Sequence, residues 1–163
     1  MQNFTSQNIK WLFTDIDGVW TDCCIYYSAE GEELKKFSYR DGMGVERLRK
    51  FTSIQIAIIT GENSPMVARR AEKLKIDRVF LGVKNKLEVI EEFIKENNLT
   101  WNQIAYIGDD MNDFDAMTRA GLKACPADAF KDILSIVDYQ CKLKGGEGAF
   151  REFCEFIINS MSL

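Results

Sequence analysis

Five aspartates stand directly after two short apolar runs, and they carry the clearest chemical signal in the sequence. They are Asp15, Asp17, Asp109, Asp110 and Asp113. Carboxylates gathered this closely repel one another, which raises their pKa values unless a cation lies among them. Because an all-oxygen set of ligands suits Mg²⁺, the pattern favours a magnesium site or a carboxylate nucleophile beside a general acid.

The composition excludes many other kinds of chemistry. The chain of 163 residues contains no histidine, so no Ser-His-Asp triad, Cys-His pair or histidine-ligated metal can form. Its five cysteines form no C-x-x-C pair, which favours free thiols over a zinc site. A net charge of -4 argues against nucleic acid as a partner. Any catalysis must use carboxylates, lysine, hydroxyl groups or a metal held by oxygen.

The acidic clusters also have simpler explanations. An EF-hand loop beginning at Asp109 would need Gly at its sixth position and Glu at its twelfth, where this chain has Phe114 and Ala120. That mismatch excludes an EF-hand. A solvated helix N-terminus, whose dipole favours acidic side chains, remains open for the second cluster. A polar turn that closes a strand remains open for Asp15 and Asp17.

Two further segments stand where they would complete a phosphate site. Thr60 and Gly61 follow the apolar run 55–59, and Lys86 opens an amphipathic segment. Each is unremarkable alone, since Thr-Gly commonly ends a strand and such a lysine is usually solvated. Together they would place a hydroxyl, a backbone amide and a positive charge beside the acidic clusters, which is what a phosphoryl group with Mg²⁺ needs.

The elements that must position these residues alternate along the chain. Amphipathic segments 64–74 and 85–97 predict helices, the first opened by Ser64 and Pro65. Runs that are apolar on both faces are typical of parallel strands covered by helices on each side. The predicted strands are 11–14, 55–59, 78–81, 104–107 and 122–125. The sequence therefore predicts an α/β fold with an open parallel sheet.

One segment breaks the alternation and predicts a β-hairpin after the first strand. Two β-prone runs, 23–27 and 34–39, flank a turn that contains glycine. We expect this flap, about residues 19–39, to project from the carboxyl edge of the sheet, where open α/β sheets bind ligands. The whole of 1–163 is expected to form one domain. With neither a signal peptide nor an apolar run of membrane-spanning length, we expect a cytoplasmic protein with no membrane partner.

The order of these motifs resembles the four motifs of the haloacid dehalogenase superfamily over nearly the whole chain. In sequence order the motifs are Asp15-x-Asp17-Gly18, Thr60-Gly61, Lys86 and Gly108-Asp109-Asp110-x-x-Asp113. The resemblance implies a Rossmann-like domain and a phosphatase that acts through an aspartyl phosphate.

The same resemblance implies a role for each motif residue. Asp15 would be the nucleophile and Asp17 the general acid and then base. Thr60 and Lys86 would hold the oxygens of the transferring phosphate. Asp15, the carbonyl of Asp17 and Asp109 would hold Mg²⁺. Two further acidic residues would be auxiliary, Asp110 and Asp113.

The short intervals between motifs leave no room for a cap domain. Three stretches, 15–22, 40–42 and 145–152, resemble the capless phosphatases that act on 3-deoxy-octulosonate 8-phosphate and on related nine-carbon sugar-acid 9-phosphates. That resemblance implies a homotetramer whose hairpins associate. It also implies a C-terminal tail, about 142–163, in which residues 144–151 reach a neighbour's active site. A flexible loop before the last helix is the alternative for the glycines of that tail.

The residue after Thr60-Gly61 bears on the substrate. By resemblance, octulosonate phosphatases generally have Arg there, whereas Glu62 followed by Lys73 fits the nine-carbon branch. We therefore favour ketodeoxynononate or N-acetylneuraminate 9-phosphate, with 3-deoxy-octulosonate 8-phosphate as the alternative. The expected substrate-binding residues are Gly61, Glu62, Lys73, Arg40 and Arg151.

Two other functions compete with that of a sugar-acid phosphatase. Similar domains attached to sialic-acid cytidylyltransferases serve chiefly as non-catalytic oligomerisation modules, but here every catalytic position is present. A phosphomutase is disfavoured because no cap would shield its intermediate from water.

Overall fold

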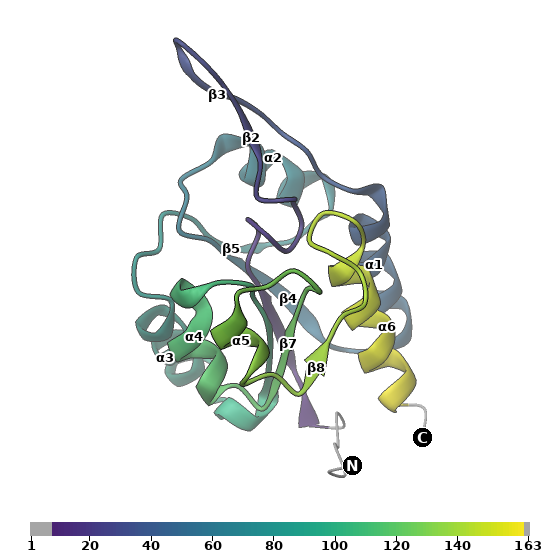
Figure 1. Cartoon of the computed structure of the whole chain (residues 1–163). Helices are drawn as coiled ribbons and strands as arrows, with labels where there is room; N and C mark the ends of the chain where they lie inside the picture. Colours follow the sequence, from purple (N-terminus) through teal and green to yellow (C-terminus); the bar gives the residue numbers. More distant parts are fainter. Residues whose placement is uncertain (1–7, 162–163) are drawn as a thin grey trace.

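A parallel sheet of six strands forms the centre of the computed structural model, which describes residues 8–161 (Figure 1). The strand order is β5-β4-β1-β6-β7-β8, and all neighbours are parallel. The strands are β1 (Trp11–Thr14), β4 (Gln55–Ile59), β5 (Arg78–Phe80), β6 (Ile104–Ile107), β7 (Leu122–Cys125) and β8 (Tyr139–Gln140). The predicted α/β class is confirmed, and the five predicted strands form with bounds that differ only at the end of β5.

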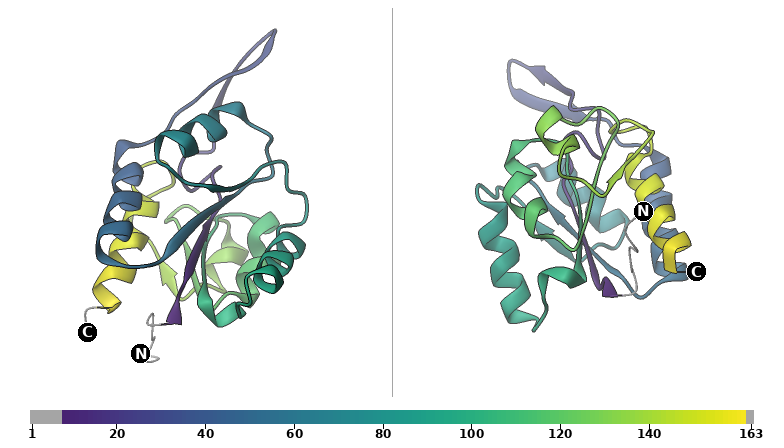
Figure 2. Two further views of the ribbon diagram at one scale, coloured as in Figure 1. Left: turned by 180° about the vertical axis from the view of Figure 1, so that it is seen from behind. Right: turned by 60° about the horizontal axis from the view of Figure 1, so that its bottom comes forward.

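Helices cover both faces of the sheet (Figure 2). One face carries α1 (Tyr39–Phe51), α2 (Pro65–Lys73) and α6 (Ala149–Met161), and the other carries α3 (Lys86–Glu96), α4 (Met111–Arg119) and α5 (Lys131–Leu134). A short 3-10 helix, Trp101–Gln103, precedes β6. Side chains alternate between the faces of a strand, so Leu12 packs into the core beneath α1 and α6 and Phe13 into the core beneath α3 and α4.

Side-chain caps fix where several helices begin. The side chain of Ser38 accepts a hydrogen bond from the backbone amide of Arg40, and that of Asn85 accepts one from Glu88. Helix α2 begins at Pro65 as predicted, but Ser64 makes no side-chain cap. The hydroxyl of Ser64 instead donates to Glu32 Oε1 at 3.5 Å, which connects the start of α2 to the hairpin.

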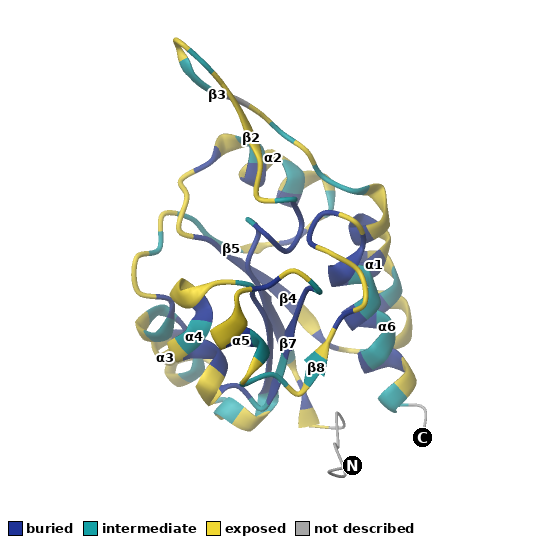
Figure 3. Cartoon of the chain, in the orientation of Figure 1, coloured by how far each residue is buried: buried dark blue, intermediate teal, exposed yellow. Residues whose placement is uncertain are grey.

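The predicted hairpin is present as a separate two-stranded sheet of β2 (Ile25–Ser28) and β3 (Gly31–Lys35). It projects from the end of the domain opposite the described chain ends, and most of it is exposed (Figure 3). Its second strand ends at Lys35 rather than Tyr39, because Ser38 caps α1 and the chain is helical from Tyr39 onward.

The C-terminal segment is part of the domain rather than an extended tail. Helix α6 lies beside α1, and Asp41 on α1 accepts a hydrogen bond at 3.1 Å from the backbone amide of Arg151 at the start of α6. The backbone amide of Gly146 donates to Val19 at 3.0 Å. A Cβ on Gly145 would lie 1.9 Å from the carbonyl oxygen of Gly18, so this close approach requires glycine.

Two glycines of the stretch 144–151, Gly145 and Gly146, pack against the turn after β1 of their own chain. Contact of this stretch with a neighbouring subunit stays a prediction. Residues 162–163 of the expected tail lie outside the described part of the chain. Among residues 8–161, no helix is both long and apolar enough to cross a membrane.

Candidate active site

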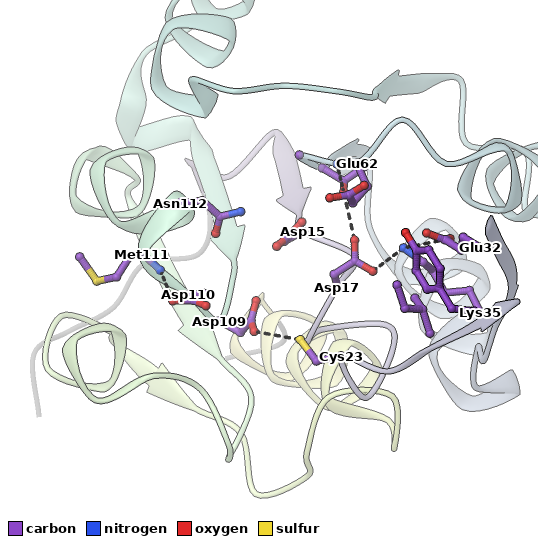
Figure 4. Close-up of a pocket in the computed structure, with 14 residues that line it drawn as sticks. Asp15, Asp17, Cys23, Glu32, Lys35, Glu62, Asp109, Asp110, Met111 and Asn112 are labelled. Carbon is purple, nitrogen blue, oxygen red and sulfur yellow. Dashed lines mark hydrogen bonds and ion pairs between the residues drawn. The ribbon is translucent and has the colours of Figure 1, made fainter. Parts of the chain in front are cut away.

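The two acidic clusters meet at the carboxyl edge of the sheet, as their positions in the sequence predict. Asp15 directly follows β1, Thr60 directly follows β4, and Asp109 lies two residues beyond β6. These strands are neighbours, with β1 in the middle. A cavity of about 490 Å³ opens between them and the hairpin, with both clusters on one side and the hairpin residues Glu32 and Lys35 on the other (Figure 4).

A tight turn holds Asp15 at this edge. Asp15 is buried, and its Oδ1 accepts hydrogen bonds from its neighbour Ile16 N at 2.7 Å and from Lys86 Nζ at 3.0 Å. The buried indole of Trp20 donates to Thr14 Oγ1 at 2.9 Å and packs on Phe150. These contacts fix the turn after β1. Burial raises the pKa of Asp15 well above its usual value, and the charge of Asp113 raises it further while Lys86 opposes both.

Lys86 is the buried cation of the site. Its side chain is 1% exposed, and its Nζ lies 2.7 Å from Asp113 Oδ1 as well as 3.0 Å from Asp15 Oδ1. Burial alone would lower the pKa of Lys86, but the two carboxylates outweigh that effect and raise it. The lysine is therefore charged and directed at the predicted nucleophile.

Asp113 supports the site from beneath. It is fully buried, and its Oδ1 accepts a hydrogen bond from Tyr106 OH at 2.6 Å in addition to the Lys86 contact. Its Oδ2 accepts from the backbone amide of Asp109 at 3.1 Å. With both oxygens already engaged, Asp113 holds Lys86 and the Asp109 loop in place.

Asp110 is exposed, and its side chain caps α4 by accepting from Met111 N at 2.6 Å. Asp110 therefore caps a helix, as the simpler explanation predicts, while Asp113 contacts the buried Lys86.

Asp109 has the properties of a cation ligand. Its Oδ1 is buried without a hydrogen-bond partner, and burial together with the charges of Asp113 and Asp110 raises its pKa to about 7. Ligand oxygens of Asp15, Asp109 and Asp113 all lie within 4.8 Å of one another. An orphaned buried carboxylate oxygen inside an all-oxygen donor set fits a small hard cation such as Mg²⁺.

Asp17 points into the cavity on the hairpin side of this cluster (Figure 4). Its Oδ1 lies 2.6 Å from Lys35 Nζ, and its Oδ2 accepts a hydrogen bond at 3.4 Å from Thr60 Oγ1. Thr60 is buried, and its hydroxyl in turn accepts a hydrogen bond from Glu62 N at 3.2 Å. The predicted acid–base residue therefore faces the cavity with Lys35 at one carboxylate oxygen and Thr60 at the other.

The predicted substrate residues divide into two groups. Gly61 and Glu62 line the cavity. Lys73 instead lines a separate groove beside α2, the guanidinium of Arg151 pairs with Glu155 at 2.6 Å, and Arg40 lies against Gly148. Gly61 and Glu62 therefore lie at the site. The other three, Lys73, Arg40 and Arg151, do not line the cavity of their own chain.

Three residues of the site were not foreseen from the sequence. Lys35 and Cys23 line the cavity, and Tyr106 supports Asp113 from the middle of β6. A lysine in a polar hairpin strand is usually solvated, and a tyrosine in an apolar strand usually belongs to the core. The unusual backbone of Cys23, with a φ of 58°, is visible only in the structure.

Charge balance defines the class of protein. A buried aspartate beside a charged lysine can attack a phosphate dianion only when a cation offsets their repulsion, and the orphaned oxygen of Asp109 marks where that cation fits. With a second carboxylate, that of Asp17, facing the same cavity on a parallel α/β sheet, the fold and site are those expected of a metal-assisted phosphohydrolase.

Comparison with known proteins identifies the family. Residues 3–127 match the family described as haloacid dehalogenase-like hydrolase. The 3-deoxy-D-manno-octulosonate 8-phosphate phosphatase of Haemophilus influenzae is 39% identical, over 94% of this chain and 85% of its own length. That of Yersinia pestis is 40% identical, over 93% and 80%. The chain belongs to the haloacid dehalogenase-like hydrolases, within the family of these octulosonate phosphatases.

Solved structures agree with this assignment. The octulosonate phosphatase of Moraxella catarrhalis, in complex with a magnesium ion, a phosphate ion and a KDO molecule, has a TM-score of 0.92 and 35% identity, covering 98% of this chain and 91% of that one. The cobalt-bound enzyme of H. influenzae has a TM-score of 0.91 and 38% identity, covering 97% and 92%. The predicted superfamily and the phosphatase class are confirmed. The nine-carbon preference inferred from Glu62 and Lys73 gains no support, because the relatives named here are eight-carbon enzymes.

Proposed function

We propose that this chain is a Mg²⁺-dependent phosphatase whose substrate is 3-deoxy-D-manno-octulosonate 8-phosphate. The observation that carries the proposal is Asp15, buried against Lys86 and beside the orphaned Asp109 oxygen, at the mouth of a cavity wide enough for a small sugar acid. The two named relatives at 39% and 40% identity act on this ester, which favours it over the nine-carbon esters.

The cation would be held by Asp15, Asp109 and the carbonyl of Asp17, with Asp113 behind them. When bound, Mg²⁺ would offset the charge of the nucleophile and of the phosphate dianion. Within the described residues, the orphaned Oδ1 of Asp109 is the donor most clearly lacking any other partner in this cluster.

The chain's own residues carry out the phosphoryl and proton transfers of both steps. Asp15 Oδ1 is engaged by Ile16 and Lys86, which leaves Oδ2 to attack phosphorus. As the new bond from Asp15 to phosphorus forms, the bond from phosphorus to the sugar oxygen breaks, and Asp17 gives that oxygen a proton. Water then attacks phosphorus, Asp17 takes its proton, and phosphate leaves with Asp15 regenerated. Lys86 remains beside the nucleophile throughout.

Steady-state kinetics with two esters test the proposal. We expect Mg²⁺-dependent release of phosphate with a larger kcat/KM on the eight-carbon 8-phosphate than on ketodeoxynononate 9-phosphate. A clear preference for the nine-carbon ester would reinstate the interpretation based on Glu62. The Asp15→Asn variant removes the nucleophile at nearly constant volume and should be inactive on both.

The oligomerisation module is the competing function. An inactive wild-type protein, or an Asp15→Asn variant as active as wild type, would favour that function over a catalytic one. The contacts around Asp15 support catalysis, because they place a carboxylate that lines the cavity beside a buried lysine and the orphaned oxygen of Asp109.

We also propose that the protein is a cytoplasmic homotetramer. The hairpin exposes large apolar side chains, among them Ile25, Tyr26, Tyr27 and Leu34, which association would cover. Sedimentation at micromolar concentration tests this proposal, and a fully active monomer would contradict it.

A further inference from the structure

Lys35 stands out among the residues that the active-site assignment does not use. It ends strand β3 of the hairpin, yet its side chain is only 1% exposed. Its Nζ lies 2.6 Å from Asp17 Oδ1 and 3.8 Å from Glu32 Oε1. Among the described residues that line the cavity it is the one basic side chain (Figure 4).

Burying an ammonium group is costly unless carboxylates accompany it. Here the hairpin places the amine between two of them, and Glu32 also accepts a hydrogen bond at 3.5 Å from Ser64 at the start of α2. A chain of polar contacts therefore runs from α2 through the hairpin to Asp17. This arrangement connects the flap to the acid–base carboxylate.

The two oxygens of Asp17 are held differently. Oδ1 receives the short ionic hydrogen bond from Lys35, whereas Oδ2 receives only the longer contact of 3.4 Å from Thr60. A charge-assisted bond of this length restricts the rotation of a carboxylate. Asp17 itself is 28% exposed to the cavity, so without Lys35 its side chain would be free to take other rotamers.

We propose that Lys35 is a positioning residue for Asp17. By holding Oδ1, the hairpin lysine leaves Oδ2 as the oxygen that carries the proton to the leaving group and receives one from water. The inference rests on the proposed phosphatase function and adds a role for the flap: the hairpin orients the acid–base group as well as bordering the cavity.

Phosphate esters whose leaving groups differ in how much they need a proton distinguish this positioning role of Lys35 from other roles. An alkyl ester needs a proton on its leaving oxygen, whereas p-nitrophenolate leaves without one. We compare kcat/KM, which reports the steps up to cleavage of the ester, on p-nitrophenyl phosphate, glycerol phosphate and the eight-carbon sugar-acid phosphate. For Lys35→Met we expect about a 10- to 100-fold loss on both alkyl esters and less than about a twofold change on the aryl ester.

Other roles for Lys35 give other patterns, and each would overturn the proposal. Equal losses on all three esters would mean that the lysine binds the phosphate. A loss confined to the sugar-acid ester would mean that it binds the substrate carboxylate, and no loss would mean that it has neither role. A wild type inactive on all three esters would instead refute the proposed function itself.

The adjacent lysine supplies a matched control. Lys36 directly follows the strand, its side chain is 59% exposed, and it pairs with Asp22. Lys36→Met should leave the ratio of alkyl to aryl kcat/KM unchanged. That ratio does not depend on the fraction of folded enzyme, so a modest loss of stability in Lys35→Met does not obscure it. If Lys35→Met does not fold, Lys35→Gln, which keeps a donor without the charge, takes its place with the same readout and a smaller expected loss.

Discussion

A methyl group at Gly18 should disable the cation site while leaving the fold largely intact. Gly18 has a φ of +87°, and a Cβ built on it would lie 1.9 Å from Asp109 Oδ2. The obstructing atom is the end of a side chain rather than backbone, so the protein can relieve the clash by turning the carboxylate of Asp109 away. In the Gly18→Ala variant the new methyl group therefore displaces the carboxylate of Asp109, and the cation loses this ligand.

The magnitude follows from these distances. Ordinary van der Waals contact begins at 3.4 Å, so the oxygen must move by about 1.5 Å. A misplacement of about 1 Å in a catalytic site costs about 100-fold in rate, and we expect kcat/KM and Mg²⁺ affinity each to fall by at least that factor. The positive φ should add about 1–3 kcal/mol of lost stability.

Gly31→Ala is the matched control. Gly31 on the hairpin also has a positive φ, +123°, but nothing lies within 4 Å of a Cβ built there. Both variants should lose similar stability in urea unfolding with EDTA. Only Gly18→Ala should lose Mg²⁺ binding by calorimetry and phosphatase activity. If Gly18→Ala bound Mg²⁺ and turned over as well as Gly31→Ala, the placement of the cation beside Asp109 would be wrong.

Four further outcomes are expected. With the pKa of Asp109 raised to about 7 by burial, a proton competes with the cation, so calorimetry should show Mg²⁺ affinity falling about tenfold per pH unit below that value; a flat profile would contradict this. For the same reason the metal-free protein should lose thermal stability as pH rises from about 4 to about 7, because the folded state keeps a proton that the unfolded state releases. Lys86→Met should abolish activity and cost about 3–5 kcal/mol in urea unfolding with EDTA, since it leaves Asp15 and Asp113 unpaired; a loss of activity alone would mean that Lys86 is not part of the framework. Asp41→Ala should cost about 1–3 kcal/mol by removing the acceptor for Arg151 N, with activity on p-nitrophenyl phosphate retained, and an unchanged unfolding midpoint would refute that role.

Much of the fold was predictable because the local sequence patterns agree with the way the elements pack in the tertiary structure. The runs 11–14, 55–59 and 104–107 are apolar on both faces and are directly followed by Asp15, Thr60 and Gly108, so the sequence indicates the strand limits and the site positions together. The second hairpin strand was predicted too long, because the cap at Ser38 competes with the β-prone residues beside it.

The remaining features depend on contacts between distant segments. Nothing local marks Lys35 as buried, since its partner Asp17 lies 18 positions earlier in the chain. Gly145 and Gly146 looked suited to approach a ligand or a neighbouring subunit, yet the surface they approach is the turn at Gly18 and Thr21 of their own chain. The length of the sugar acid was inferred chiefly from Glu62, and a single cavity residue is a weak basis for specificity.

Asp15 should carry the phosphoryl group during turnover, and this covalent adduct can be trapped. Wild-type protein mixed with Mg²⁺ and the eight-carbon 8-phosphate, quenched in acid within milliseconds and digested, should yield the peptide containing Asp15 with the added mass of one phosphoryl group. Asp15→Asn treated in the same way should show none. An active wild type with an unmodified Asp15 peptide at every quench time, or with the phosphoryl group on another residue, would contradict the account.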